Sequence, residues 1–155
     1  MSSHLRERRL DNPSSWQWTI AFFEDITSHP NEKFLPLLHL VQQLAASEYA
    51  PYFRAGQSVW SLVISTAARN GLRFDEPYVR VALLRLDIPD TWQVGYYRGA
   101  LADDLLDSRS CSTESLLPIV TVFLQRLWQE TRGEKLPVPA WFEGTNQQPK
   151  QPEDN

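Results

Sequence analysis

The stretch FRAGQSVWSLVISTAARNGLRFDEPYVRVALLRLDIPDTWQVGYYR, residues 53–98, decides the fold because it contains two different hydrophobic periods. In its first half, apolar residues recur at i, i+3 and i+4 spacing, which predicts a helix over residues 58–70. The apolar stripe of this helix consists of Val59, Trp60, Val63, Ile64, Ala67 and Ala68. Ser58 or Gly56 suits its start as an N-cap, and Asn70-Gly71 suits its end because glycine adopts the left-handed conformation without strain.

The second half of the stretch changes to a period of two, which predicts a β-hairpin. Its strands cover residues 78–86 and 91–98, with a four-residue turn between them. The expected cross-strand pairs are Val81 with Tyr96, Leu83 with Val94, and Arg85 with Trp92, the last as a cation–π contact. One face of the hairpin is then apolar and suited to a core, whereas the other carries Arg80, Gln93 and Tyr97.

The rest of the chain reads as helix or loop that covers this central pair. Helical spacing predicts three further helices, at residues 12–28, 31–47 and 112–131. Residues 99–112 read as a loop with one short helical turn, and the prolines of residues 136–142 predict an extended strap. We therefore expect an α+β fold in which a β-hairpin packs against about four α-helices. If the strap pairs with the hairpin, the sheet gains a third strand.

The length of 155 residues fits a single domain with a sizeable core. We expect a flexible N-terminal arm at residues 1–11, one α+β domain at 12–142, and a disordered C-terminal tail at 143–155. The tail lacks core-forming residues, and the arm is polar and basic.

Composition narrows the class of partner and the compartment. A net charge of -4 argues against general nucleic-acid binding, which needs a basic surface. No apolar run approaches the roughly 18 residues of a membrane span, and the charged N-terminus lacks the apolar centre of a signal peptide. The single cysteine, Cys111, forms no internal disulfide, which agrees with a cytoplasmic location.

The sequence contains no recognisable catalytic or metal-binding constellation. His4, His29 and His39 are scattered and lack partner ligands at metal-binding spacing. There is no phosphate-binding glycine loop and no nucleophile elbow. Cys111 precedes a predicted helix, where the dipole lowers a thiol pKa, but no histidine is near it in sequence and an incidental thiol is the simpler interpretation. We expect no catalytic residue, no metal and no cofactor.

Three features remain as candidate binding sites. The first is the hairpin face with Arg80, Gln93 and Tyr97; we expect Arg80 and Tyr97 to be partly exposed and to contribute to partner recognition, unless Trp141 of the strap covers Tyr97. The second is a set of loop aspartates that suits a basic partner, although solvated aspartates are a simpler explanation. Its members are Asp87, Asp90, Asp103 and Asp104, with Asp107 beside them.

The third candidate is the predicted helix start at residues 54–58, where Arg54, Gly56 and Ser58 would bind an anion together with backbone N–H groups. A plain capped turn is the simpler interpretation of the same residues, since a single glycine is weak evidence of a phosphate cradle.

Together these features favour a non-enzymatic protein of bacterial type that binds another protein, as an accessory subunit or an immunity or antitoxin-like inhibitor. The alternative is a small-molecule or anion-binding domain that uses Arg54 and Ser58 with Arg73 and Arg80; an enzyme is one form that this alternative allows. The runs FRAGQSVWSLVISTAARNG and EPYVRV resemble segments of small bacterial proteins, but this resemblance implies no activity and assigns no residue a role. A polar pocket beside Ser58 would favour the alternative, and a flat aromatic and acidic surface would favour protein binding.

Overall fold

The computed structural model describes residues 12–28, 31–58, 60–66, 76–99, 101–139 and 141. The arm predicted at residues 1–11 and the tail predicted at residues 143–155 lie outside this part of the chain. The single domain over residues 12–142 stays a prediction.

Within the described residues, five strands form one antiparallel sheet whose spatial order follows the chain, β1-β2-β3-β4-β5. The strands are β1 (Arg54–Gln57), β2 (Leu62–Ser65), β3 (Tyr78–Arg85), β4 (Ile88–Tyr97) and β5 (Leu105–Ser112). The α-helices are α2 (Asn12–Ile26), α3 (Leu35–Ala45) and α4 (Leu116–Arg132). The short 3-10 turns are η1 (Glu32–Phe34), η2 (Ala50–Tyr52), η3 (Ala102–Asp104) and η4 (Thr113–Ser115). The α+β class is therefore confirmed, but five strands and three α-helices replace the predicted hairpin and four helices.

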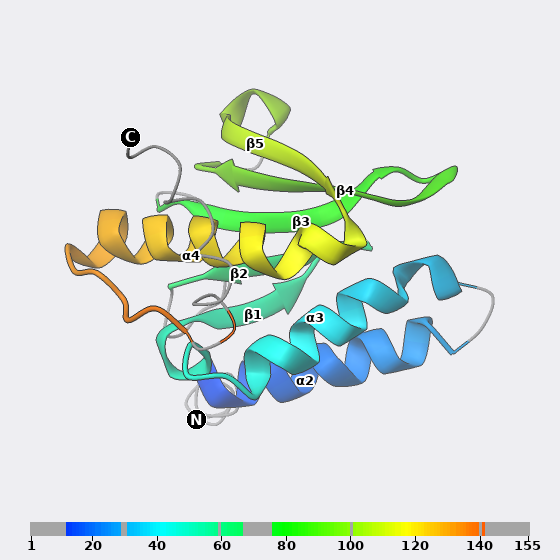
Figure 1. Cartoon of the computed structure of the whole chain (residues 1–155), viewed down its shortest axis with the longest axis horizontal. Coiled ribbons are helices and arrows are strands. Elements are labelled where there is room, and N and C mark those ends of the chain that lie inside the picture. The colour runs from blue at the N-terminus through cyan, green and yellow to red at the C-terminus, as the bar shows by residue number, and fades with distance from the viewer. Residues whose placement is uncertain are drawn as a thin grey trace, which may run out of the picture.

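Figure 1 shows α4 crossing the middle of one sheet face, while α2 and α3 lie side by side at the β1 end. The core lies between this sheet face and the helices. Its fully buried sheet residues are Leu62, Ile64, Val79, Val81, Trp92, Val94 and Tyr96. The hydrophobic pattern predicts seven core residues, and six of them lie in this core: Ile64, Val81, Leu83, Val94, Phe123 and Leu127. The seventh, Val63, is buried in a second cluster with Tyr78 and Tyr97.

The three predicted outer helices are found close to their expected positions. Pro13 and Pro36 each lie in the first turn of their helix, where a missing N–H costs no intrahelical hydrogen bond. Gly133 ends α4 with a φ of 75°, and its N–H donates to the carbonyl of Gln129 (2.9 Å). Glycine reaches this left-handed conformation without the Cβ clash that other residues incur.

The helix predicted over residues 58–70 is wrong, because residues 54–65 form the β1–β2 hairpin. Ser58 and Ser61 exchange backbone hydrogen bonds of 3.0 and 3.1 Å across its turn. Trp60 holds a positive φ of 62° in this turn and stacks on Phe34 at 4.8 Å. All four β2 residues are buried, and such a short apolar run cannot be distinguished from a buried helical segment by periodicity alone. Residues 67–70 of the predicted helix, and residues 71–75 that follow it, lie outside the described part of the chain.

The predicted β3–β4 hairpin is confirmed, but its register differs from the prediction by two residues. Val81 pairs with Val94 and Leu83 with Trp92, because the loop has two residues rather than four and a bulge follows Leu83. A shift of two residues leaves every side chain on its predicted face. The expected Arg85–Trp92 contact is also wrong: Arg85 forms an ion pair with Asp87 (2.9 Å).

Two further segments differ from the sequence-based expectation. The loop predicted at residues 99–112 contains the expected helical turn, η3, but continues as the edge strand β5. The strap is extended, and Leu136 and Trp141 contact the core as expected. Trp141 donates from Nε1 to Oγ1 of Thr121 in α4 (3.0 Å), and none of the described strap residues joins the sheet.

Candidate functional site

A groove of about 420 Å³ lies where α2 meets the edge strand β1. Trp18 and Phe22 of α2 form one wall, residues 54–58 form the other, and Val63 of β2 lies in the floor. The volume falls in the range of about 300–1,000 Å³ that is usual for ligand pockets. Apolar side chains therefore line much of a hollow that is large enough to receive a side chain or a small molecule.

Two polar residues of this groove, Ser15 and Thr19, make hydrogen bonds within the fold. Ser15 accepts a hydrogen bond at Oγ from the backbone N–H of Ala55 (2.9 Å), which fastens α2 to β1. Thr19 donates from Oγ1 to the carbonyl of Ser15 (2.8 Å). Their hydrogen bonds lower the cost of burying these hydroxyls. The exposed polar rim is formed by Gln57 and Ser58.

Trp18 is the most unusual side chain of the groove because it is 60% exposed. Trp16, two residues earlier, is buried and donates from Nε1 to the carbonyls of Ala50 (3.0 Å) and Phe53 (3.1 Å). Two residues correspond to about 200° around a helix, so the two tryptophans point to opposite sides. Sequence reasoning missed Trp18, although its position off the apolar stripe of residues 12–28 is a signal that identifies an exposed tryptophan.

The three residues of the predicted anion site all line this groove, but no helix begins there. Arg54 is buried in β1, Gly56 is half-buried, and Ser58 is exposed at the turn. The expected helix N-terminus, which was to supply backbone N–H groups to an anion, is thus replaced by a strand and a turn. Arg73 lies outside the described residues.

The predicted hairpin face is partly exposed. Arg80 is half-buried and donates from Nε to Oγ of Ser61 (3.0 Å), and it lies across from Val63 of the groove floor. Gln93 is half-buried opposite Ala82. The expectation that Tyr97 is exposed is wrong, since only 9% of it is accessible.

The burial of Tyr97 comes from its own sheet neighbours. Its ring stacks on Tyr78 with centroids 5.5 Å apart, and the Tyr78 hydroxyl donates to the carbonyl of Gly99 (2.5 Å). Trp141 does not provide the cover, because it contacts Tyr49 and Thr121 instead. Of the sequence-predicted set, Arg80 is the cross-strand neighbour of the groove residue Val63, but neither Arg80 nor Tyr97 is among the described residues that line the groove.

The loop aspartates do not form one acidic surface. Asp87 and Asp90 lie at one end of β4, and Asp103 and Asp104 follow its other end, on the order of 25 Å away along the strand. Three of the four are engaged locally. Asp87 pairs with Arg85, which holds the pKa of Asp87 below its ordinary value. Asp90 accepts a hydrogen bond from Oγ1 of Thr113 (2.9 Å). Asp104 accepts a hydrogen bond from the backbone N–H of Leu101 (2.9 Å).

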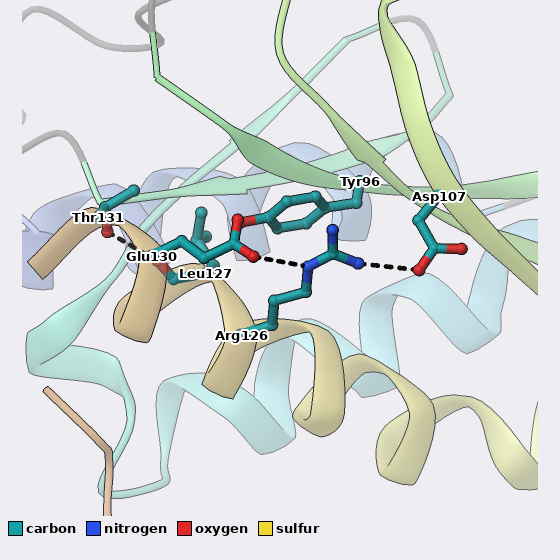
Figure 2. Close-up of polar contacts among 6 residues, drawn as sticks. All are labelled: Tyr96, Asp107, Arg126, Leu127, Glu130 and Thr131. Carbon is teal, nitrogen blue, oxygen red and sulfur yellow. Dashed lines mark hydrogen bonds and ion pairs between the residues drawn. The ribbon is translucent and has the colours of Figure 1, made fainter. Parts of the chain in front are cut away.

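The most strongly coupled charges connect α4 to the sheet (Figure 2). Arg126 donates to Asp107 of β5 (2.8 Å) and to Glu130 (3.1 Å), and its guanidinium lies 4.1 Å from the ring centre of Tyr96. Tyr96 donates to Glu130 (2.7 Å). Burial, followed by the Glu130 hydrogen bond, raises the pKa of Tyr96, while that same hydrogen bond and Arg126 lower the pKa of Glu130. Among the described residues, the hydrogen bonds and ion pairs of the Arg126, Asp107, Glu130 and Tyr96 side chains join these four to one another, so we assign the cluster a structural role.

A second hollow, of about 650 Å³, lies between α3 and the start of α4. His39 and Glu114 are on its wall, and Trp141 closes one side. Among the described residues, no group of three or more histidine, cysteine or acidic side chains is placed to hold a metal ion. Cys111 is partly buried in β5, and burial raises the pKa of its thiol, contrary to the lowering expected beside a helix start.

None of the helices in the described part of the chain has both the length and the apolar character needed to cross a bilayer. No family model, no curated protein and no solved structure matches this chain.

Proposed function

We propose that this is a non-enzymatic protein of bacterial type that binds another protein, as an accessory subunit or an immunity-type inhibitor, through the groove between α2 and β1. The observation that supports this proposal is the placement of an exposed tryptophan, Trp18, beside an apolar hollow. Tryptophan is enriched among the residues that dominate interface energetics because it combines a large contact area with one hydrogen-bond donor.

The partner segment is expected to carry an apolar side chain next to an acidic one. The apolar side chain fits between Trp18, Phe22 and Val63. Arg80 lies across from Val63, and only its Nε hydrogen bond to Ser61 is seen among the described residues. The guanidinium presents further N–H groups that suit a carboxylate.

We place this activity in the cytoplasm. The single thiol, Cys111, is free and partly buried, as suits a compartment that keeps thiols reduced.

A small-molecule or anion ligand is the second candidate, and one observation favours it. Arg54, Gly56 and Ser58, the residues that the sequence predicted for such a site, all line the groove. A ligand with an apolar body and one anionic group would match the apolar wall and the polar rim. Titration of the purified protein with small aromatic carboxylates, followed by calorimetry, tests this candidate separately from protein binding.

Filling the groove tests the leading proposal. A Cβ placed on Gly56 meets no atom within 4 Å, so a side chain can start at this position, and Gly56→Leu adds apolar volume to the lining of the hollow. Wild-type protein is used as bait in the native host, and the partner that it retains is purified before the variant is tested. We expect Gly56→Leu to weaken the measured affinity for that partner at least tenfold.

A matched control comes from an exposed apolar residue elsewhere. Leu101 is 70% exposed and lies outside the groove, so Leu101→Ala should leave the affinity unchanged. Circular dichroism and a melting curve confirm that each variant is folded. If folded Gly56→Leu binds the partner as tightly as the wild type does, the groove is not the binding site.

A further inference from the structure

In the described part of the chain, a helix lies beside the β1 edge of the sheet, whereas the β5 edge is exposed. On the β1 edge, α2 lies alongside, and its Ser15 accepts the N–H of Ala55 (2.9 Å). On the other edge, β5 has no strand beyond it within the described residues, and residues 106–110 are exposed. An edge strand presents alternate backbone N–H and C=O groups outward, where another strand can pair with them. β5 contains neither proline nor lysine, two residues that commonly protect such an edge.

The charged residues of β5 alternate with serines. Asp107 and Arg109 lie on the face that carries α4, and Ser108 and Ser110 lie on the other face. Asp107 uses Oδ2 to accept from Arg126, and Figure 2 shows its second carboxylate oxygen directed away from that residue. Arg109 makes no ion pair with any described residue. One carboxylate oxygen and one guanidinium are thus available on the same face, two positions apart.

We propose that two copies of this chain pair antiparallel through β5, with Ser108 opposite Ser108 of the second copy. In this register each Asp107 lies opposite Arg109 of the other copy, so the two-fold axis creates two ion pairs of opposite charge on one face. Leu106, which is 53% exposed, lies where β5 bulges against β4, so the regular part of the pairing begins at Asp107. The two sheets form one continuous sheet, with the α4 helices on the same side.

The charges also select this register over its neighbours. Directly opposite residues of an antiparallel pair share a face, so a symmetric pairing shifts the central residue one position at a time. A shift to one side places Arg109 opposite Arg109, and a shift to the other places Asp107 opposite Asp107. Like charges directly opposite each other destabilise a strand pair. The short segment from Asp107 to Arg109 is therefore complementary to itself, which identifies a second copy as the occupant.

Disulfide trapping tests the register directly. In a Cys111→Ser background, which removes the chain's single cysteine, a Ser108→Cys variant brings two thiols opposite each other across the axis. Opposite residues lie about 4.5–5.5 Å apart between Cα atoms, within the range that a disulfide spans. The matched control is Ser110→Cys in the same background, because the two copies of Ser110 lie about 14 Å apart along the strands. We expect mild oxidation to give a covalent dimer with Ser108→Cys and none with Ser110→Cys.

Sedimentation equilibrium tests the ion pairs without any cysteine. We expect the wild type to dimerise, Arg109→Asp to dimerise at least tenfold more weakly, and Arg109→Lys to dimerise nearly as well as the wild type. Arg109 is exposed, so melting curves should show that these variants stay folded. A wild-type protein that remains monomeric up to its solubility limit, a dimer unaffected by Arg109→Asp, or equal trapping of both cysteine variants would each overturn the proposal.

Discussion

Gly56 of β1 and Gly95 of β4 lie in the same cross-strand row of the sheet, separated by β2 and β3, and they differ in the space around them. Both belong to strands, and neither requires a positive φ. A Cβ on Gly95 would lie 2.6 Å from Cε1 of Tyr97 and 3.1 Å from Cδ1 of Leu105, whereas a Cβ on Gly56 meets nothing within 4 Å. Gly95 therefore makes room for the buried Tyr97 ring, and Gly56 leaves the groove open.

This contrast predicts opposite effects of the same substitution. Gly95→Ala should lower the free energy of unfolding by about 1–3 kcal/mol, because the Tyr97 ring must move from its stack on Tyr78. Gly56→Ala should raise it by about 0.4–1 kcal/mol, because alanine reduces the entropy of the unfolded chain without strain. Urea denaturation of the two variants measures both effects. Equal changes in the two would contradict the assigned surroundings of these glycines.

At the scale of the elements, α4 is joined to the sheet by the hydrogen bond from Tyr96 to the carboxylate of Glu130, a group that can be protonated. The Tyr96 hydrogen bond and Arg126 hold the pKa of Glu130 below its ordinary value of 4.5. A lowered folded-state pKa contributes stability that is present above the unfolded pKa and is lost as the pH falls through the folded pKa. The side chain is 43% exposed, so the contribution is within about 1 kcal/mol.

Comparison of Glu130→Gln with the wild type measures this contribution. The wild type should melt at a higher temperature than the variant at pH 6 to 7, and the difference should shrink as the pH falls below the ordinary value of 4.5 and through the lower folded-state pKa. Glutamine keeps an acceptor for the Tyr96 hydroxyl and removes only the charge. A difference that stays constant from pH 7 to pH 3 would show that the charge of Glu130 does not act through this contact.

Sequence periodicity predicted the elements that bury one face and expose the other. It misassigned β2 and β5, which do not have one buried and one exposed face. α2, α3, α4 and the β3–β4 hairpin each carry a clear apolar stripe. β2 is buried on both faces, so Leu62, Val63 and Ile64 form a continuous run that also fits a helix. β5 is exposed on both faces, and only the serines at every second position indicate a strand.

The site was predictable to a smaller extent, because it combines elements that are distant in sequence. Residues 54–58 were identified from a helix start that does not exist, although they do line the groove. The opposite wall comes from α2, about 35 residues earlier in the chain. No local pattern predicts that Trp18 and Gly56 line the same groove, since this follows from the packing of α2 along β1.

At the scale of the whole molecule, the helices cover one face of the sheet and leave the groove and the β5 edge at opposite sides of the strand order. The proposed partner site and the proposed pairing of two copies therefore do not compete for the same surface. Exposed Leu84, Leu86 and Ile88 at the tip of the β3–β4 hairpin, which projects beyond the other strands in Figure 1, offer a different contact surface. A measurement that distinguishes the groove from this tip tests where the partner binds.

The indole N–H signals in a ¹⁵N correlation spectrum provide that measurement. Trp18 is assigned by its loss in Trp18→Phe, and the purified partner is added to saturation. We predict that the Trp18 signal shifts or broadens, whereas the signal of Trp16, whose Nε1 is held by the carbonyls of Ala50 and Phe53, stays in place. A Trp18 signal that is unchanged in the saturated complex would contradict partner binding at the groove.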